Sequence, residues 1–231
     1  MEISTSILSV KKENAVKTFY NIEEAKTDYF HIDVMDGKFV KENTLKFMNE
    51  SLQTLNHITN TPLDIHLMVE EPAIFIEKYL SFNPLIITVH VESENYKEAI
   101  ELIKNAGLKA GISIKPDTPV GSIKFLLPYI SLILVMTVEP GLGGQQLIPK
   151  TIDKIKELYK YREENNLDYF IEADGGINLD TINLVKGAGA DIAVCGTAIV
   201  NSNNIKETIK ELKKWAWKKN RDKIAAMWTG F

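Results

Sequence analysis

The stretch that decides the fold of this chain is His31-Ile32-Asp33-Val34-Met35-Asp36-Gly37, which indicates a buried strand running into a tight turn. Side chains alternate along a strand, so His31, Asp33 and Met35 share one face while Ile32 and Val34 share the other. A charged group inside a strand is costly to bury unless it is paired, bound to a metal or used in function. We therefore expect other parts of the chain to supply partners for His31 and Asp33.

The composition is that of a globular protein: 231 residues, 45% hydrophobic and 25% charged, with a net charge of −4. This charge argues against a nucleic-acid partner, which would require a basic surface. Cys195 is the single cysteine, so an intrachain disulfide framework is excluded and a reducing compartment is favoured. The sequence shows no signal-peptide pattern and no apolar run near about 18 residues, so we expect a cytoplasmic protein without a membrane partner.

Short strand-like runs alternate with longer segments of helical period along the chain. The expected strands cover residues 3–8, 29–34, 63–69, 85–90, 108–114, 132–136, 169–173 and 191–195. The expected helices cover residues 11–25, 44–56, 72–80, 96–106, 120–126, 149–165 and 179–188, with a last one from about 205. Eight such units predict an α/β fold, a single parallel eight-stranded (β/α)8 (TIM) barrel over residues 1–231. An open doubly wound sheet is the alternative.

The C-terminal segment is basic and contains tryptophan. Residues 206–223 hold eight Lys or Arg against three Asp or Glu, with Trp215 and Trp217 among them and Trp228 beyond. A helix of this kind is compatible with a membrane surface. We favour a final barrel helix with a solvated basic face, because a helix is needed there to complete the barrel.

Polar residues stand near the ends of three predicted strands, and in a (β/α)8 barrel this end carries the active site. His31 and Asp33 belong to the second strand, His66 to the third and Asp174 to the seventh. Two imidazoles and two carboxylates suit a divalent metal ion such as Zn²⁺, Mn²⁺ or Fe²⁺. The alternative is that each of the four residues is separately structural.

Glycine-rich segments follow the last three strands, within Pro140–Gln145, at Gly175-Gly176 and at Gly196-Thr197. Glycine lets backbone amides approach an anion closely, and loops after the last strands of such barrels often bind phosphate. The three segments together predict a phosphate site, whereas any one of them could be only a turn.

Other reactive side chains are assigned structural roles. We interpret His57 and His90 as satisfied core histidines, and Cys195 as a small apolar side chain of the last strand rather than a nucleophile. The sequence contains neither a Gly-Lys-Ser/Thr triphosphate motif nor a dinucleotide fingerprint, so a nucleotide cofactor is unsupported.

Six motifs between about residues 3 and 200 resemble, in the same order, the ribulose-phosphate 3-epimerase family. They are Ser4-Thr5-Ser6-Ile7-Leu8, His31-Ile32-Asp33-Val34-Met35-Asp36-Gly37, Leu63-Asp64-Ile65-His66-Leu67-Met68-Val69, Met136-Thr137-Val138-Glu139-Pro140-Gly141, Gly143-Gly144-Gln145 and Glu172-Ala173-Asp174-Gly175-Gly176-Ile177. The resemblance implies a metal-dependent (β/α)8 barrel that interconverts D-ribulose 5-phosphate and D-xylulose 5-phosphate. The reaction that this resemblance implies inverts C3 of the sugar through an enediolate.

The resemblance also implies roles for individual residues. His31, Asp33, His66 and Asp174 would bind the metal, with Asp33 and Asp174 also the acid and base, whereas Asp36 is a turn residue. The resemblance implies that the methionines lie near the reacting carbons and that the glycines contact the phosphate. The full set of implied substrate contacts is Ser6, Met35, His66, Met68, Met136, Gly141, Leu142, Gly143, Gly144, Gly175, Gly176, Gly196 and Thr197.

Some positions depart from the usual family pattern. Residues 39–43 read Phe-Val-Lys-Glu-Asn instead of Phe-Val-Pro-Asn, Leu142 replaces an aromatic residue, and Thr197 replaces a serine. Thr197 and the segment 28–31 resemble related 3-epimerases of D-allulose 6-phosphate, whereas the segment 174–177 resembles the pentose enzymes. The hexose phosphate is therefore an alternative substrate.

Two further alternatives are a non-catalytic barrel that binds sugar phosphates and a metal-free barrel isomerase whose histidines are structural. We expect the partner to be a small-molecule ketose phosphate and the protein to be a homo-oligomer.

Overall fold

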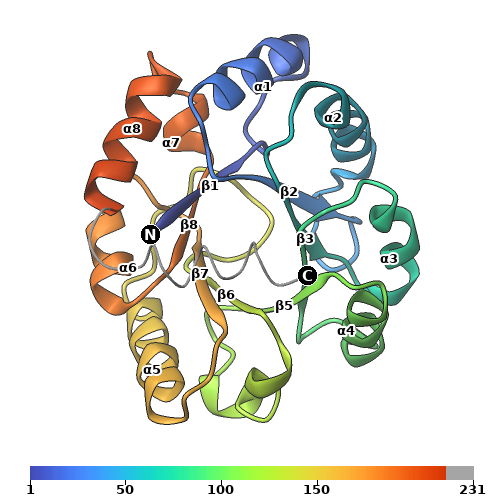
Figure 1. Ribbon diagram of the computed structural model, residues 1–231, viewed down its shortest axis with the longest axis vertical. Helices are drawn as coiled ribbons and strands as arrows, with labels where there is room; N and C mark the ends of the chain where they lie inside the picture. Colours follow the sequence, from blue (N-terminus) through green and yellow to red (C-terminus); the bar gives the residue numbers. More distant parts are fainter. Residues whose placement is uncertain (217–231) are drawn as a thin grey trace.

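The structure is a computed structural model that describes residues 1–216. Eight parallel strands follow one another around a closed barrel, and β1 pairs with β8 to complete it. Figure 1 shows the helices as a ring outside the strands. The predicted single (β/α)8 barrel is confirmed, and the pairing of β1 with β8 excludes the open sheet.

The strands and helices alternate as predicted. The strands are β1 (Glu2–Ser6), β2 (Tyr29–Met35), β3 (Leu63–Met68), β4 (Ile86–His90), β5 (Lys109–Ile114), β6 (Leu132–Met136), β7 (Phe170–Asp174) and β8 (Ile192–Cys195). The α-helices are α1 (Ala15–Glu24), α2 (Leu45–Ile58), α3 (Ala73–Leu80), α4 (Tyr96–Asn105), α5 (Thr151–Glu164), α6 (Ile182–Ala188), α7 (Thr197–Val200) and α8 (Ile205–Ala216). The 3-10 helices are η1 (Lys12–Asn14), η2 (Val120–Ile123) and η3 (Leu127–Tyr129).

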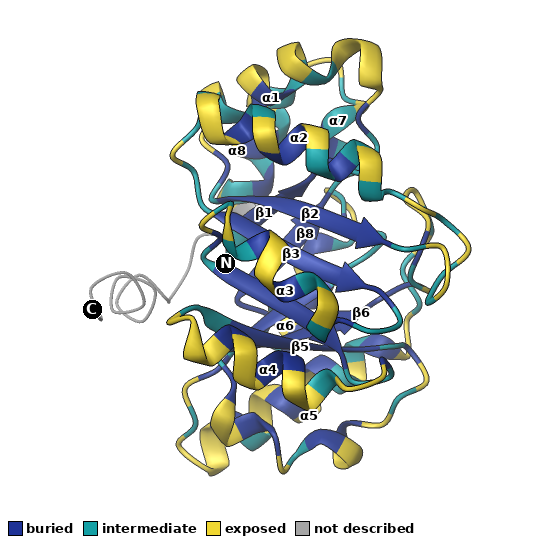
Figure 2. Cartoon of the chain, turned by 90° about the vertical axis from the view of Figure 1, so that its right-hand side faces the viewer, coloured by how far each residue is buried: buried dark blue, intermediate teal, exposed yellow. Residues whose placement is uncertain are grey.

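Alternation along the strands separates two kinds of buried surface. Outward-facing side chains such as Ile32 and Val34 pack with the helices in one large apolar core. Figure 2 shows the result, with buried strands and helices that are exposed only on their outer faces. Inside the barrel, Tyr29, Ile86 and Leu132 belong to a smaller apolar cluster at the beginnings of their strands. This cluster fills one end of the barrel.

The rest of the barrel interior is polar. Its buried polar side chains include Ser4, Ser6, His31, Asp33, Asp64, His66, Thr88, His90, Ser113 and Glu172. Burying so many polar groups in a barrel core costs free energy unless they are paired with one another or with a ligand. The interior toward the carboxyl ends of the strands is therefore the place to look for function.

The fifth unit differs from the prediction. We expected a helix over residues 120–126, whereas the structure has the two short 3-10 helices η2 and η3. Pro128 contributes to the difference, because a proline disfavours the α conformation at the residue before it and so stops a helix that would continue from residue 120. The prediction of a regular helix there was wrong.

The last helix of the described residues, α8, covers the barrel beside α1 and α6 (Figure 1). Ile209 and Leu212 are its buried anchors. Trp217 and Trp228 of the tryptophan-bearing segment lie outside the described residues. Within residues 1–216, no helix is both long enough and apolar enough to cross a membrane.

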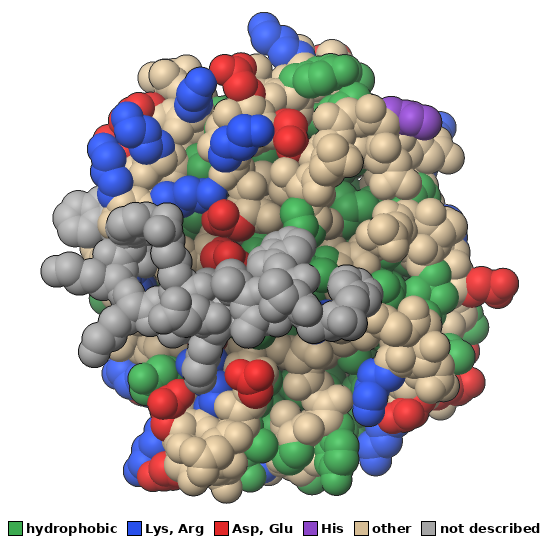
Figure 3. Space-filling model, viewed as in Figure 1, with side chains coloured by type: hydrophobic (Ala, Val, Ile, Leu, Met, Phe, Trp, Pro, Cys, Tyr) green, Lys and Arg blue, Asp and Glu red, His purple; other side chains and the backbone are tan. Residues whose placement is uncertain are grey.

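The basic face of α8 is paired with acidic side chains. The Lys206 ammonium lies 3.0 Å from a Glu24 oxygen, and the Lys213 ammonium lies 2.8 Å from an Asp28 oxygen. Figure 3 shows Lys and Asp or Glu side chains next to one another on this side of the surface. Exposed pairs of this kind contribute little stability, so the apolar anchors dominate the attachment of α8.

Gly111 of β5 provides a test of packing inside the barrel. A Cβ added at this glycine would lie 2.3 Å from Thr88 Oγ1 and 3.2 Å from a methyl group of Leu132. We expect Gly111→Ala to lower the free energy of unfolding by about 1–3 kcal/mol, as overpacking does, measured by urea denaturation. Gly121→Ala, where nothing lies within 4 Å of the added Cβ, is the control. Equal stability of the two variants would contradict this packing.

Candidate active site

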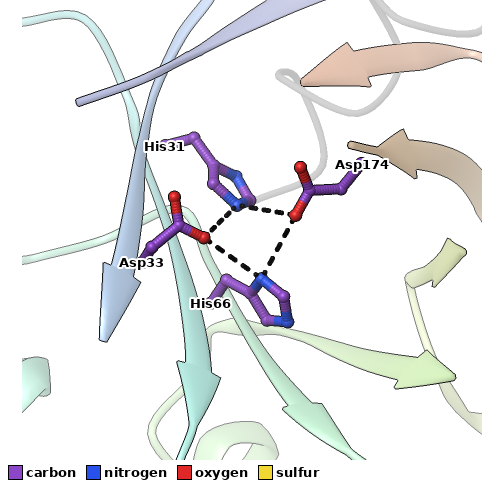
Figure 4. Close-up of side chains that lie close together, drawn as sticks. All are labelled: His31, Asp33, His66 and Asp174. Carbon is purple, nitrogen blue, oxygen red and sulfur yellow. Dashed lines mark ion pairs between the residues drawn. The ribbon is translucent and has the colours of Figure 1, made fainter. Parts of the chain in front are cut away.

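Four predicted ligand residues converge inside the barrel, near the carboxyl ends of β2, β3 and β7. Asp33 Oδ1 lies 3.3 Å from His31 Nε2 and 3.5 Å from His66 Nδ1. Asp174 Oδ2 lies 3.8 Å and 3.6 Å from the same two nitrogens. Figure 4 shows that the two carboxylates alternate with the two imidazoles around a common centre. The structure thus brings together all four residues that the sequence singled out.

The geometry of this group fits a divalent metal ion. His31 Nε2 and His66 Nδ1 are buried and have no hydrogen-bond partner, although such atoms are normally satisfied. An ion with four tetrahedral bonds of about 2.1 Å holds its ligand atoms about 3.4 Å apart. The four nitrogen–oxygen separations of 3.3 to 3.8 Å are close to this spacing, and all four ligand atoms lie within 4.8 Å of one another, which a single ion could bind.

The charges around His31 favour a cation at the same place. Burial works against a charged imidazole, but Asp64 and Asp33 outweigh it and raise the pKa of His31 well above its usual value. The carboxylates that favour a proton on His31 Nε2 equally favour a metal ion bound there. The site is therefore electrostatically suited to hold a positive charge.

The orientation of His31 is set from behind by a carboxylate. Asp64 Oδ2 lies 2.6 Å from His31 Nδ1 and also accepts a 2.8 Å hydrogen bond from the Ser4 hydroxyl. A proton on Nδ1 leaves the lone pair of Nε2 directed into the four-residue group, as in many metal sites. Burial, followed by the charge of Asp64, raises the pKa of nearby Glu172 well above its usual value, so Glu172 stays neutral.

Asp33 is held in its ionised form. Burial alone would raise the pKa of Asp33, but the charge of His31 and the close approach of the His31 and His66 imidazoles lower it below the ordinary range. The Ser6 hydroxyl donates a 2.7 Å hydrogen bond to its Oδ2. At neutral pH this carboxylate can therefore bind a cation or accept a proton.

The second imidazole of the group, His66, is supported by a histidine. Its Nε2 lies 2.9 Å from Nε2 of His90, whose Nδ1 lies 3.0 Å from Glu92 Oε2. Burial lowers the pKa of His90 to about 4, so its ring is neutral at physiological pH. The interpretation of His90 as a buried, satisfied histidine agrees with its position. For His57 the same interpretation was wrong, because His57 is exposed on α2.

A pocket opens above the four-residue group. Its lining contains all the predicted substrate-binding residues except His66, which lies beneath: Ser6, Met35, Met68, Met136, Gly141, Leu142, Gly143, Gly144, Gly175, Gly176, Gly196 and Thr197. Asp33 and Asp174 also line it. Cys195 is buried in β8, and burial raises the pKa of its thiol, in keeping with its predicted packing role.

One side of the pocket is made of glycines and hydroxyls. The hydroxyls of Ser9 and Thr197 lie 2.8 Å apart, and an added Cβ at Gly143 would lie 3.0 Å and 3.4 Å from them. Gly176 has φ +67°, and an added Cβ would lie 2.4 Å from the backbone nitrogen of Leu147. A side chain is excluded at Gly176 and would be tightly packed at Gly143, so this side of the pocket offers backbone and hydroxyl groups to an anion.

The sequence prediction missed several residues of the site. Ser9 and Asn178 line the pocket, and Asp64, Glu172 and Glu92 surround the histidines. Strand alternation could have found two of them, since Asp64 precedes His66 by two residues and Glu172 precedes Asp174 by two. Ser9 and Asn178 lie in loops and follow no such rule.

Comparison with known proteins shows that the family resemblance of the sequence motifs extends over most of the chain. The model of the Ribulose-phosphate 3 epimerase family matches residues 2–200. The ribulose-phosphate 3-epimerase of Bacillus subtilis (strain 168) is 37% identical over 215 residues, 92% of this chain and 98% of that protein. The enzyme of the same name from Methanocaldococcus jannaschii is 35% identical over 217 residues, 94% of this chain and 91% of that protein.

Solved structures share the fold at lower sequence identity. The 3-hexulose-6-phosphate synthase of Salmonella typhimurium has a TM-score of 0.71 at 13% identity, covering 93% of this chain and 98% of that one. The 3-keto-L-gulonate-6-phosphate decarboxylase of Vibrio cholerae has a TM-score of 0.70 at 15% identity, covering 94% and 99%. These two show the barrel alone. The family match over residues 2–200 and the two relatives above 30% identity show that this chain belongs to the ribulose-phosphate 3-epimerase family.

Proposed function

We propose that this protein is a divalent-metal-dependent 3-epimerase that interconverts D-ribulose 5-phosphate and D-xylulose 5-phosphate. The observation that carries the proposal is the placement of Asp33 and Asp174, which face one pocket from β2 and β7 with both histidines between them (Figure 4). Two carboxylates on different sides of a bound sugar can remove a proton from one face of C3 and deliver one to the other. Family membership supports this choice of substrate.

His31, Asp33, His66 and Asp174 would hold the ion, and their donor set suits Zn²⁺, Mn²⁺ or Fe²⁺. A bound divalent ion would supply Lewis-acid stabilisation of the negative charge that develops on the sugar oxygens when the C3 proton leaves. The same residues therefore bind the ion and remain beside the reacting carbon.

The chain's own groups account for the inversion. In one direction Asp33 accepts the C3 proton while Asp174 delivers a proton to the opposite face; the reverse direction exchanges their roles. A single base would return its proton to the face from which it came. Met35, Met68 and Met136 line this part of the pocket and exclude water without competing as acids.

The phosphate is proposed to bind at the glycine side of the pocket. Gly143, Gly176 and Gly196 line the pocket and have no side chain that could block an anion, and Ser9 and Thr197 offer hydroxyl donors. This placement puts the phosphate beside the loops after β6, β7 and β8, where barrels of this class commonly bind it.

The two-aspartate scheme can be tested by proton NMR of the substrate in D₂O. Wild-type enzyme should invert C3 and replace its proton with deuterium. Asp33→Asn and Asp174→Asn should each lower turnover by about 10²–10⁴-fold, the usual contribution of a general acid or base. The control is Asp36→Asn, because Asp36 accepts backbone N–H groups of Lys38, Phe39 and Glu70 outside the group of four. Comparable losses in Asp36→Asn would show that the wrong carboxylate is assigned.

Metal binding can be tested on protein purified without chelator. We expect one tightly held divalent ion per chain by elemental analysis. Adding Zn²⁺ to chelator-treated protein at 100 times its Kd should stabilise the fold by about 2.7 kcal/mol, seen as a Tm rise of roughly 5–10 °C. His31→Ala should lose both effects, whereas His57→Ala, an exposed histidine on α2, should keep them. Full activity of metal-free protein would refute the metal role.

Substrate choice is tested by comparing kcat/KM for D-ribulose 5-phosphate and D-allulose 6-phosphate. We expect the pentose phosphate to be preferred by at least about tenfold, equivalent to about 1.4 kcal/mol in the transition state. A preference for the hexose phosphate would assign the chain to the alternative function. Binding of both without turnover would indicate a non-catalytic sugar-phosphate-binding barrel.

A further inference from the structure

The hydrogen-bonded chain behind His66 is longer than the one behind His31. His90, at the end of β4, is fully buried, and its Nε2 lies 2.9 Å from Nε2 of His66. The two ring centroids are 5.0 Å apart and the ring planes differ by 22°, so the imidazoles meet nearly edge to edge. One nitrogen of this pair must donate a hydrogen and the other must accept it.

The site decides which nitrogen donates. His66 Nδ1 faces Asp33 and Asp174, and it can hold a metal ion only through a free lone pair. The proton of neutral His66 must then sit on Nε2 and be donated to His90. His90 in turn must carry its own proton on Nδ1, which lies 3.0 Å from Glu92 Oε2.

Glu92 is placed to accept a hydrogen bond from the Nδ1–H group of His90. Its other carboxylate oxygen accepts a 2.9 Å hydrogen bond from the backbone N–H of Lys115 and another from the Thr118 hydroxyl. A carboxylate offers only acceptors, and a backbone N–H can only donate. Because Glu92 can only accept, His90 Nδ1 must donate to Glu92 and His90 Nε2 must accept the hydrogen bond from His66 Nε2.

The two imidazoles of this hydrogen-bonded chain are fully buried, whereas the Glu92 side chain is 21% exposed. The Phe39 ring lies 4.7 Å from the His90 ring, and the Lys115 ammonium lies 4.0 Å from the centre of the Phe39 ring. Phe39 belongs to the loop that follows β2, the strand that carries two of the metal-site residues. A dry surrounding strengthens hydrogen bonds of this kind and raises the cost of leaving one unmade.

We propose that His90 and Glu92 are positioning residues that hold His66 in the tautomer able to bind the metal. Without them, the His66 proton can move to Nδ1, where Asp33 and Asp174 oxygens at 3.5 Å and 3.6 Å would accept it. That tautomer presents an N–H and no lone pair to Asp33 and Asp174, so it cannot bind a metal ion at this site. Asp64 orients His31 by a direct contact with its Nδ1, whereas Glu92 orients His66 through a second imidazole, that of His90. The inference rests on the proposed metal site.

The test measures Zn²⁺ affinity by competition with a chelating dye. His90→Phe keeps the ring but removes both hydrogen bonds, and Glu92→Gln places a donor where an acceptor is needed. Each should weaken binding by about 10–100-fold, as loss of a group that orients a metal ligand typically does. His90→Gln keeps an acceptor for His66 and a donor for Glu92, so it should recover much of the affinity. Glu94→Gln, the same change at an exposed residue, should bind like wild type.

A spectroscopic measurement separates orientation from stability. Long-range ¹H–¹⁵N NMR of the Zn²⁺-loaded protein should show the His66 proton on Nε2 and the His90 proton on Nδ1. Circular dichroism confirms that each variant is folded, and Glu92, which is partly exposed, provides a variant that leaves the barrel interior intact. A folded Glu92→Gln or His90→Phe variant with wild-type Zn²⁺ affinity would overturn the positioning role of His90 and Glu92 while leaving the metal site in place. Failure of the wild-type protein to bind Zn²⁺ would instead overturn both the metal site and this positioning role.

Discussion

The structure depends on one constraint: polar side chains inside a closed barrel must find partners, because an unpaired buried polar group is costly. Asp64 is the hydrogen-bond partner of His31, Ser6 that of Asp33, and Glu92 that of His90. Of the buried imidazole nitrogens in residues 1–216, the two that lack a partner are those turned toward Asp33 and Asp174. The imidazole hydrogen-bonding capacity that remains unused therefore lies within the group formed by His31, Asp33, His66 and Asp174.

The two faces of each strand divide stability from chemistry. In β2, Ile32 and Val34 face the helices and belong to the large apolar core, whereas His31 and Asp33 face the interior. The outer core and the apolar cluster at the beginnings of the strands supply the hydrophobic burial that holds the barrel closed. This burial offsets the cost of the polar interior.

The fold by itself does not specify this chemistry. A synthase and a decarboxylase of sugar phosphates have the same barrel at 13% and 15% identity. Barrels of this class change their reaction by changing side chains at the carboxyl ends of the strands. In this chain those positions hold two histidines and two aspartates beneath a pocket lined by glycines and hydroxyls, and the chain belongs to the epimerase family.

The sequence alone predicted the barrel, the strands and the four residues that converge in it, because strand alternation and the order of units are local properties of the chain. It misjudged the segment 120–126, which forms a short 3-10 helix, and His57, which is exposed on α2. Only the tertiary structure decided which polar groups meet. His66 and His90 become neighbours through the pairing of β3 with β4, and Asp33 and Asp174 through barrel closure, so their distances follow from tertiary structure and not from any spacing in the sequence.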